Sequence, residues 1–133
     1  MENRYLFRAK RIDTGEWVEG YLSYPFCTEK GNESYYFYAK DSLGFFCRCV
    51  VDASTICQCT GRNDKNGKLI YENDIMVAYY DEEKPVMVVW RECGLVAAEN
   101  NSDELCPLDY FTQKHFYVVG NIFDNPELLE VRL

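Results

Sequence analysis

Four of the seven cysteines fall in two closely spaced pairs, and thiols are the residues of this chain with the most distinctive chemistry. Cys47 and Cys49 lie two residues apart, as do Cys57 and Cys59, so each pair would occupy one face of a strand. If the two strands formed a hairpin around residues 52–54, Cys47 would face Cys59 and Cys49 would face Cys57, with Cβ atoms about 4.5–5.5 Å apart. Such a quartet could hold a metal ion through thiolates or act as redox-sensitive thiols.

Two observations favour a simpler interpretation of these thiols. Metal sites usually take their ligands from tight loop corners rather than from neighbouring rungs of a flat sheet. Cysteines in a reducing compartment are commonly buried as small hydrophobic residues. We therefore assign no metal-binding or cofactor-binding residue and expect reduced thiols, with a metal or redox site as the alternative.

The single histidine and three carboxylates are the other candidates for chemistry. His115 precedes an apolar segment, and no serine or cysteine motif accompanies it, so a partly packed histidine at a strand end is favoured over a catalytic base. Asp64, Glu72 and Asp74 could supply a paired acid and base. Because turns are normally polar, we interpret these carboxylates as solvated turn residues.

Recognisable ligand-binding loops are missing from the sequence. A calcium loop around Asp64 is rejected, because its register would place Arg62 at the first ligand position and Asn73 where a bidentate glutamate is needed. No glycine-rich phosphate loop and no G-x-S-x-G motif occurs. The sequence gives no positive evidence for an enzyme, and we assign no catalytic residue.

The elements that would position these residues are mostly strands. The chain has 133 residues, the size of one domain, and its aromatic content of 16% favours strands. Residues 13–15, Asp-Thr-Gly, predict a hairpin turn. Loops or turns are expected at 25–32, 61–68 and 81–84, residues 100–113 are ambiguous with one short helix, and residues 125–130 resemble a helix start. Strands are expected at 5–12, 16–24, 34–39, 45–51, 55–60, 75–80, 86–90 and 116–123, with 95–98 extending the strand at 86–90.

This pattern predicts a single all-β domain over residues 1–133, with short antiparallel strands in small barrel-like sheets and a short C-terminal helical turn. The net charge of −8 disfavours general binding to nucleic acid, since the best basic patch, Arg8, Lys10 and Arg11, is small. The N-terminal residues have no signal-peptide core, and no apolar run approaches the ~20 residues that span a bilayer. We therefore expect a cytoplasmic protein with no membrane association.

Three stretches in order along the chain carry a family resemblance. They are residues 7–9 with 14–20, residues 60–61 with 64–68 and 70–75, and residues 119–123 with 125–129. In these stretches the chain resembles the YopX family of phage and prophage proteins. The resemblance implies an all-β, barrel-like fold of phage origin in a bacterial host cytoplasm, and no activity or catalytic residue that could be carried over.

Two departures from the family pattern are informative. The family usually has glycine between Glu72 and Asp74, where this chain has Asn73. Glycine indicates a left-handed backbone, and asparagine is the next most tolerant residue, so we expect the turn to be kept. The family often has tyrosine in place of Cys59, which counts against the cysteine quartet as a family feature.

The expected function is that of a phage accessory protein that acts through protein–protein contacts, with a nucleic-acid-binding small β-barrel as the alternative. In a strand, Tyr35 and Phe37 would point to one face while Tyr36 and Tyr38 point to the other. The second pair needs a cover, which is either another layer of the same chain or a neighbouring subunit. We expect a homo-oligomer, and contact with a phage or host protein.

Overall fold

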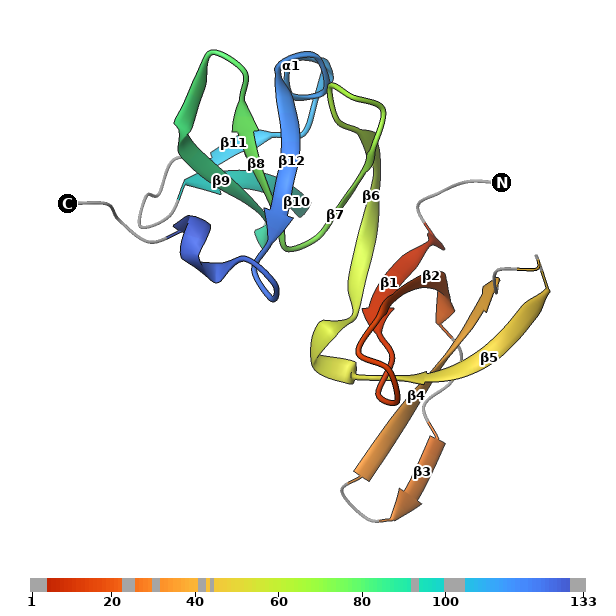
Figure 1. The fold of residues 1–133 in the computed structure, drawn as a ribbon. Coiled ribbons are helices and arrows are strands. Elements are labelled where there is room, and N and C mark those ends of the chain that lie inside the picture. The colour runs from red at the N-terminus through yellow and green to blue at the C-terminus, as the bar shows by residue number, and fades with distance from the viewer. Residues whose placement is uncertain are drawn as a thin grey trace. The chain divides into compact units, whose positions relative to one another are not determined.

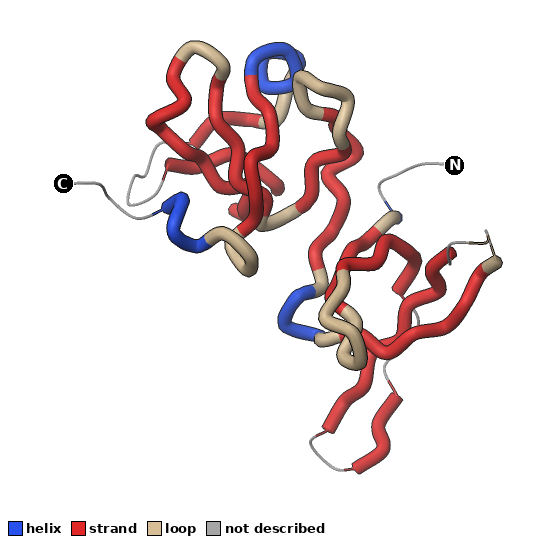
Figure 2. The backbone as a smooth tube through the Cα atoms, in the orientation of Figure 1, coloured by secondary structure: helices blue, strands red, loops and turns tan. Residues whose placement is uncertain are grey.

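The computed structural model of the protein describes residues 5–22, 26–29, 32–40, 43, 45–91, 94–99 and 105–129. Antiparallel strands dominate it, so the predicted all-β fold class is confirmed (Figures 1 and 2). The chain divides into two compact units, Met1–Cys59 and Thr60–Leu133. Among the described residues, no helix is long and apolar enough to cross a membrane.

Unit 1 is a curved antiparallel sheet in the order β3-β4-β2-β1-β6, in which β5 also pairs with β4. A single bridge between Arg11 and Val51 brings the end of β5 to the end of β1 (Figure 1), and the described strands form a small curved sheet that does not close into a barrel. Its elements are β1 (Phe7–Lys10), β2 (Trp17–Leu22), β3 (Phe26–Glu29), β4 (Asn32–Lys40), β5 (Phe46–Val51), the 3₁₀ turn η2 (Ala53–Thr55) and the start of β6 (Cys57–Asn63).

The core of unit 1 follows from the alternation of side chains along its strands. Its buried members are Ala9 on β1, Phe37 and Ala39 at alternate positions on β4, and Cys49 and Val51 at alternate positions on β5. The predicted alternation along β4 is confirmed, because Phe37 is buried while Tyr38 is exposed. A Cβ atom on Gly20 would collide with the backbone of Tyr38, so the pairing of β2 with β4 requires glycine there.

Unit 2 is built on a sheet in the order β11-β10-β9-β8-β12. Its core holds Ile70, Met76, Val86, Val88 and Ala97. The second half of β6 begins this unit, and the remaining elements are β7 (Leu69–Tyr71), β8 (Asp74–Ala78), β9 (Asp81–Arg91), β10 (Gly94–Glu99), β11 (Leu105–Pro107), α1 (Tyr110–His115), β12 (Phe116–Asn121) and the 3₁₀ helix η3 (Pro126–Leu129). The predicted C-terminal helical turn is therefore present as η3.

Several predicted boundaries are wrong for identifiable reasons. The expected loop at 25–32 contains β3, since the strand-forming residues Phe26, Cys27 and Thr28 outweigh the flanking Pro25 and Gly31. The expected acidic loop at 81–84 is the start of β9. Its charged side chains are largely exposed, so a strand forms here without the free-energy penalty of burying charge. Residues 94–99 form a separate strand, β10, that pairs back onto β9.

Candidate functional site

The hairpin that would bring the two cysteine pairs together does not form. β5 pairs with β4, whereas the start of β6 pairs with β1. The cause lies in η2, whose Thr55 accepts a hydrogen bond from the backbone N–H of Lys10 at 2.9 Å and so ties the segment after β5 to β1. Asp52 caps the same turn through a 3.0 Å bond from the N–H of Ser54. The chain therefore leaves β5 and places β6 beside β1 instead of returning along β5.

Three of the four thiols are buried. Cys49 lies in the core of unit 1, while Cys57 and Cys59 are buried on β6 and Cys47 is half-buried. The Cys57 thiol donates to the carbonyl of Thr55 at 3.2 Å. Within the described part of the chain, no three histidine, cysteine or acidic side chains come together in a way that could hold a metal ion.

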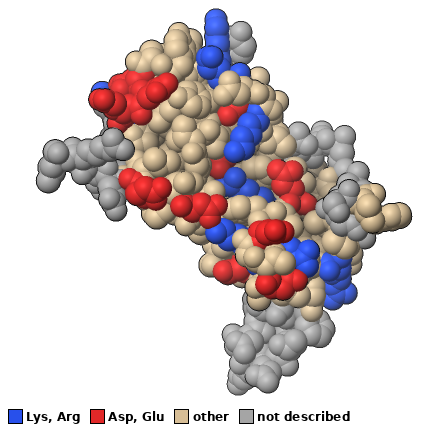
Figure 3. All heavy atoms as spheres, viewed as in Figure 1, with Lys and Arg blue, Asp and Glu red and all other residues tan. Residues whose placement is uncertain are grey.

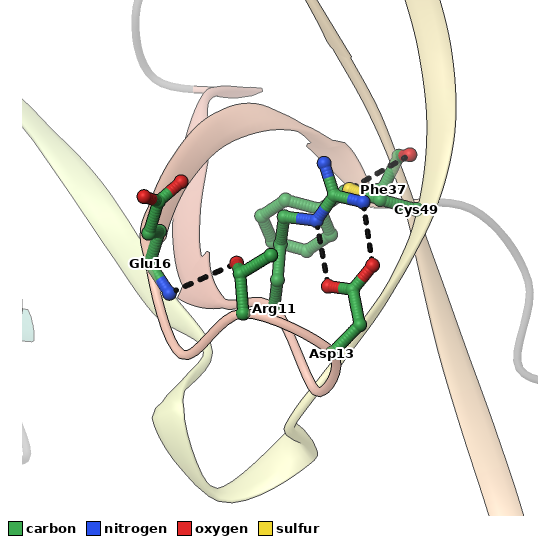
Figure 4. Close-up of polar contacts among 6 residues, drawn as sticks. Arg11, Asp13, Glu16, Phe37 and Cys49 are labelled. Carbon is green, nitrogen blue, oxygen red and sulfur yellow. Dashed lines mark hydrogen bonds and ion pairs between the residues drawn. The ribbon is translucent and has the colours of Figure 1, made fainter.

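A guanidinium lies beside one of these thiols (Figure 4). Arg11 donates from Nε and Nη2 to the two carboxylate oxygens of Asp13, at 2.9 and 2.7 Å. This paired hydrogen bond raises the pKa of Arg11 and lowers the pKa of Asp13. Burial raises the pKa of Cys49 and outweighs the opposing effect of the nearby Arg11 charge. Cys49 is thus held as a neutral thiol, which is the opposite of what a nucleophile requires.

The carboxylate of Asp64 holds a turn in place through hydrogen bonds to the backbone. It is buried, with 4% of its surface exposed. Its Oδ1 accepts from the N–H groups of Asn66 and Lys68, each at 2.9 Å, and its Oδ2 accepts from the N–H of Val118 on β12, also at 2.9 Å. The interpretation of Asp64 as a solvated residue is wrong, because its carboxylate is buried and its oxygens accept hydrogen bonds from three backbone N–H groups.

Asp74 and Asn73 form a second structural corner. Asp74 is fully buried and accepts the N–H of Tyr71 at 2.8 Å, so the solvated interpretation is wrong here too. Asn73 has φ of 69°, the left-handed conformation predicted from the family pattern. Its N–H donates to the carbonyl of Val88 on β9, and its carbonyl accepts from the N–H of Ile122, the residue that follows β12. Glu72 is half-buried.

The strongest candidate for a functional surface is a group of aromatic rings in unit 2, which we call the aromatic cluster: Tyr79, Tyr80, Phe111 and His115. The His115 ring lies 4.3 Å from Phe111, 5.6 Å from Tyr79 and 6.0 Å from Tyr80, between ring centroids. Despite these contacts, Tyr79, Tyr80 and Phe111 each leave more than half of their surface exposed. Three large rings in one exposed group are unusual for a surface that meets only water.

The backbone fixes the aromatic cluster from three directions. Tyr79 and Tyr80 form the turn between β8 and β9, where Ala78 pairs with Asp81. The N–H of Tyr79 donates to the carbonyl of His115 at 3.0 Å, which places the two rings on one face of the β8–β12 ladder. Phe111 reaches the same face from α1, one helical turn before His115.

His115 serves as the centre of this packing. The predicted strand-end histidine packed against neighbours is what the structure contains, at the last residue of α1. Its Nδ1 is buried and has no hydrogen-bond partner among the described residues, so ring contacts hold the imidazole in place.

Charged residues of both signs lie near the aromatic cluster in the chain or in space. Lys65 places its ammonium 5.4 Å from the Tyr79 ring centre, and its own backbone N–H bonds to Phe116 on β12. Lys114 precedes His115 in the last turn of α1. Asp81, Glu82 and Glu83 follow the two tyrosines on the β9 side.

Figure 3 shows acidic side chains gathered over the β8–β9 tip and basic side chains over α1. One acidic residue is fixed in place, because Tyr117 donates its hydroxyl to Glu82 at 2.8 Å. That hydrogen bond raises the pKa of Tyr117. The arrangement can bind a partner through exposed rings and direct it with the bordering charges.

Comparison with known proteins supports a family assignment. The family model described as YopX protein matches residues 6–130. The crystal structure of protein EF1440 from Enterococcus faecalis is similar, with a TM-score of 0.56 and 25% sequence identity, covering 93% of this chain and 96% of that one. No curated protein matches.

Proposed function

The chain belongs to the YopX family, and we propose that it is a phage-encoded accessory protein that acts through contacts with other proteins, including copies of itself, in the cytoplasm of a bacterial host. The observation that carries this proposal is the aromatic cluster, in which Tyr79, Tyr80 and Phe111 are 53%, 58% and 52% exposed. Tyrosine and phenylalanine are enriched at protein interfaces, because they bury a large area for little loss of conformational freedom.

The chemistry around the cluster favours a protein partner over a nucleic acid. Single-stranded nucleic acids bind where aromatic rings lie in a positively charged groove. Lys65 supplies such charge beside Tyr79, but the acidic run Asp81, Glu82 and Glu83 directly after the two tyrosines would repel a phosphate backbone. The net charge of −8 adds to that repulsion.

A second exposed aromatic position lies in unit 1. Tyr38 on β4 is 46% exposed and pairs with Arg48 on β5 and with Tyr21 on β2. The Arg48 guanidinium covers the neighbouring Tyr36 at 4.0 Å from its ring centre. Arg48 therefore provides part of the cover that Tyr36 needs, and Tyr38 is the better candidate for a subunit contact on this face.

Light scattering after size exclusion tests the self-association. We expect a mass above the 15.6 kDa of a single chain, increasing with protein concentration. Replacing Tyr80 or Tyr38 by alanine separates the two surfaces, since only the residue at the contact should lower the mass. The mass of a single chain at every concentration would contradict self-association.

A further inference from the structure

A second group of aromatic rings lies on one face of the unit 1 sheet. Tyr21 of β2 pairs with Tyr38 of β4, and Tyr38 pairs with Arg48 of β5, so the three side chains form a row across three strands. Because neighbouring strands lie about 4.8 Å apart, this row is about 10 Å long. It occupies the face opposite the core, since Phe37 and Cys49 at the alternating positions are buried.

Cations lie against the rings of this face. Arg48 is exposed, and its guanidinium lies 4.0 Å from the centre of the Tyr36 ring. On β1 and β2 the same face holds Trp17, with the Arg8 guanidinium 4.9 Å and the Lys10 ammonium 5.3 Å from its ring centre. Rings and positive charges are therefore interleaved across the four strands β1, β2, β4 and β5.

The charge of this face differs from that of the whole chain. Among the described side chains at its paired positions, Arg8, Lys10 and Arg48 are the cations and Glu19 is the one carboxylate. Glu19 lies opposite Arg8, which is buried, so Lys10 and Arg48 supply the excess of positive charge. The net charge of −8 therefore does not describe this face.

We propose that this face binds single-stranded nucleic acid, and we call it the aromatic–basic face: Lys10, Trp17, Tyr21, Tyr38 and Arg48. Proteins that bind single strands combine rings on which bases stack with cations that follow the phosphates, and sheets can present such rings on an exposed face. Tyr38, 46% exposed, and Tyr21 beside it stack bases, while Arg48 at the end of their row contacts a phosphate.

This arrangement of rings and cations favours a single strand over two other anionic partners. The bases of a duplex are already stacked on one another, so they are not available to the tyrosine rings. An acidic protein segment offers carboxylates to Arg48 and Lys10 but no flat surface to the rings. The inference concerns unit 1 and is independent of the aromatic cluster in unit 2.

Fluorescence anisotropy with a labelled oligothymidylate and a labelled RNA of mixed sequence tests the binding. At about 50 mM salt we expect dissociation constants of about 1–100 µM, the range of binding without sequence preference. Annealing the labelled strand to its complement should weaken binding roughly tenfold, because the bases are then no longer available for stacking.

Two variants separate the stacking contact from the phosphate contact. Tyr38→Ala should weaken binding roughly tenfold through the loss of one stacked base, with an unchanged dependence on salt. Arg48→Ala should weaken binding and also lower the slope of log Kd against log salt concentration by about 0.7, the value for one phosphate contact on a single strand. Arg48→Lys keeps the charge and should keep the slope.

Tyr80→Ala and Arg62→Ala are the matched controls. Tyr80 is also an exposed tyrosine but belongs to unit 2, and Arg62 is an exposed arginine on the second half of β6. Both variants should bind the oligonucleotides as the wild type does. Melting temperatures should stay unchanged throughout, since the four replaced side chains are all exposed.

Several results would overturn the inference. They are the absence of binding at low salt, binding that Tyr38→Ala and Arg48→Ala leave unchanged, and binding that is lost in Tyr80→Ala instead. Polyglutamate that competes as strongly as unlabelled oligonucleotide would assign the face to acidic protein segments. A lower oligomer mass in Tyr38→Ala, with oligonucleotide binding unchanged, would assign it to a subunit contact and leave the proposed function standing.

Discussion

Two turns in unit 2 are built in opposite ways. The turn after Asp64 has a carboxylate that accepts backbone N–H groups and a glycine, Gly67, at φ of 83°. The turn between β8 and β9 consists of Tyr79 and Tyr80, although such positions usually hold Gly, Asn or Asp. Among the described residues Asn73 is the only non-glycine residue with positive φ, so neither tyrosine adopts the left-handed backbone of a common hairpin turn.

The first turn is built by residues that hydrogen-bond to the backbone, whereas the second turn presents exposed side chains. Both carboxylate oxygens of Asp64 accept hydrogen bonds from backbone N–H groups. The rings of Tyr79 and Tyr80 remain largely exposed, and the turn is tied to β12 through the backbone N–H of Tyr79. Changes at the first turn should therefore cost stability, whereas changes at the second should cost association.

The largest effect is expected from Asp64→Ala. The substitution leaves three backbone N–H groups without their acceptor, including that of Val118 in the β12 strand. We expect the free energy of unfolding to fall by about 3 kcal/mol, measured by urea denaturation. Asp64→Asn retains one acceptor oxygen and should lose less. A loss below about 1 kcal/mol for Asp64→Ala would refute the structural role.

A smaller loss is expected at Asn73, where the left-handed backbone selects the residue. Asn73→Ala should lower the free energy of unfolding by about 1–2 kcal/mol, because a Cβ without a polar side chain tolerates this conformation poorly. Asn73→Gly is the matched control and should be nearly neutral. Equal losses in the two variants would indicate that side-chain contacts, rather than φ, determine the choice of asparagine.

At the second turn, Tyr80→Ala should change the free energy of unfolding by less than about 0.5 kcal/mol. The ring is 58% exposed, so little buried area is lost. Urea denaturation at a protein concentration low enough to keep the chain monomeric measures the effect. A loss comparable to that of Asp64→Ala would remove the distinction between the two turns.

The smallest effect concerns the β1–β2 turn, which resembles the Asp64 turn but is exposed. The hydrogen bond from Arg11 lowers the pKa of Asp13 in the folded protein. The stabilisation it provides is therefore complete above the unfolded pKa of about 3.9 and is lost as the pH falls through the folded pKa. Asp13→Asn should flatten this part of the stability profile slightly, and an unchanged profile would contradict a contribution from the pair.

Much of the fold could be predicted from local residue chemistry. The Asp13–Gly15 turn, the alternation around Phe37 and the left-handed backbone at Asn73 each depend on a few neighbouring residues. Strand pairing was harder to predict, because Asp52 and Thr55 direct the chain by bonding within η2 and to β1 rather than by setting up a hairpin. The two-residue turn at 79–80 was missed since an acidic run follows it and has the composition of a loop.

The candidate site was beyond sequence reasoning for a different reason. His115 was recognised as a packed residue, but its ring partners Tyr79 and Tyr80 come from a distant turn and meet it only through the β8–β12 ladder. The available signal was two adjacent tyrosines directly before an acidic run, in a segment that otherwise reads as a turn. The rings are candidates for a contact surface because they are exposed, and their exposure depends on the tertiary structure.

The most direct test of the central claim is the concentration dependence of backbone amide chemical shifts by NMR. If the aromatic cluster is the contact surface, the amides of Tyr80, Glu83 and Phe111 should shift progressively with protein concentration, while those of Asn73 and Cys49 stay fixed. Shifts confined to other residues, or none at concentrations where the mass exceeds that of one chain, would contradict the claim.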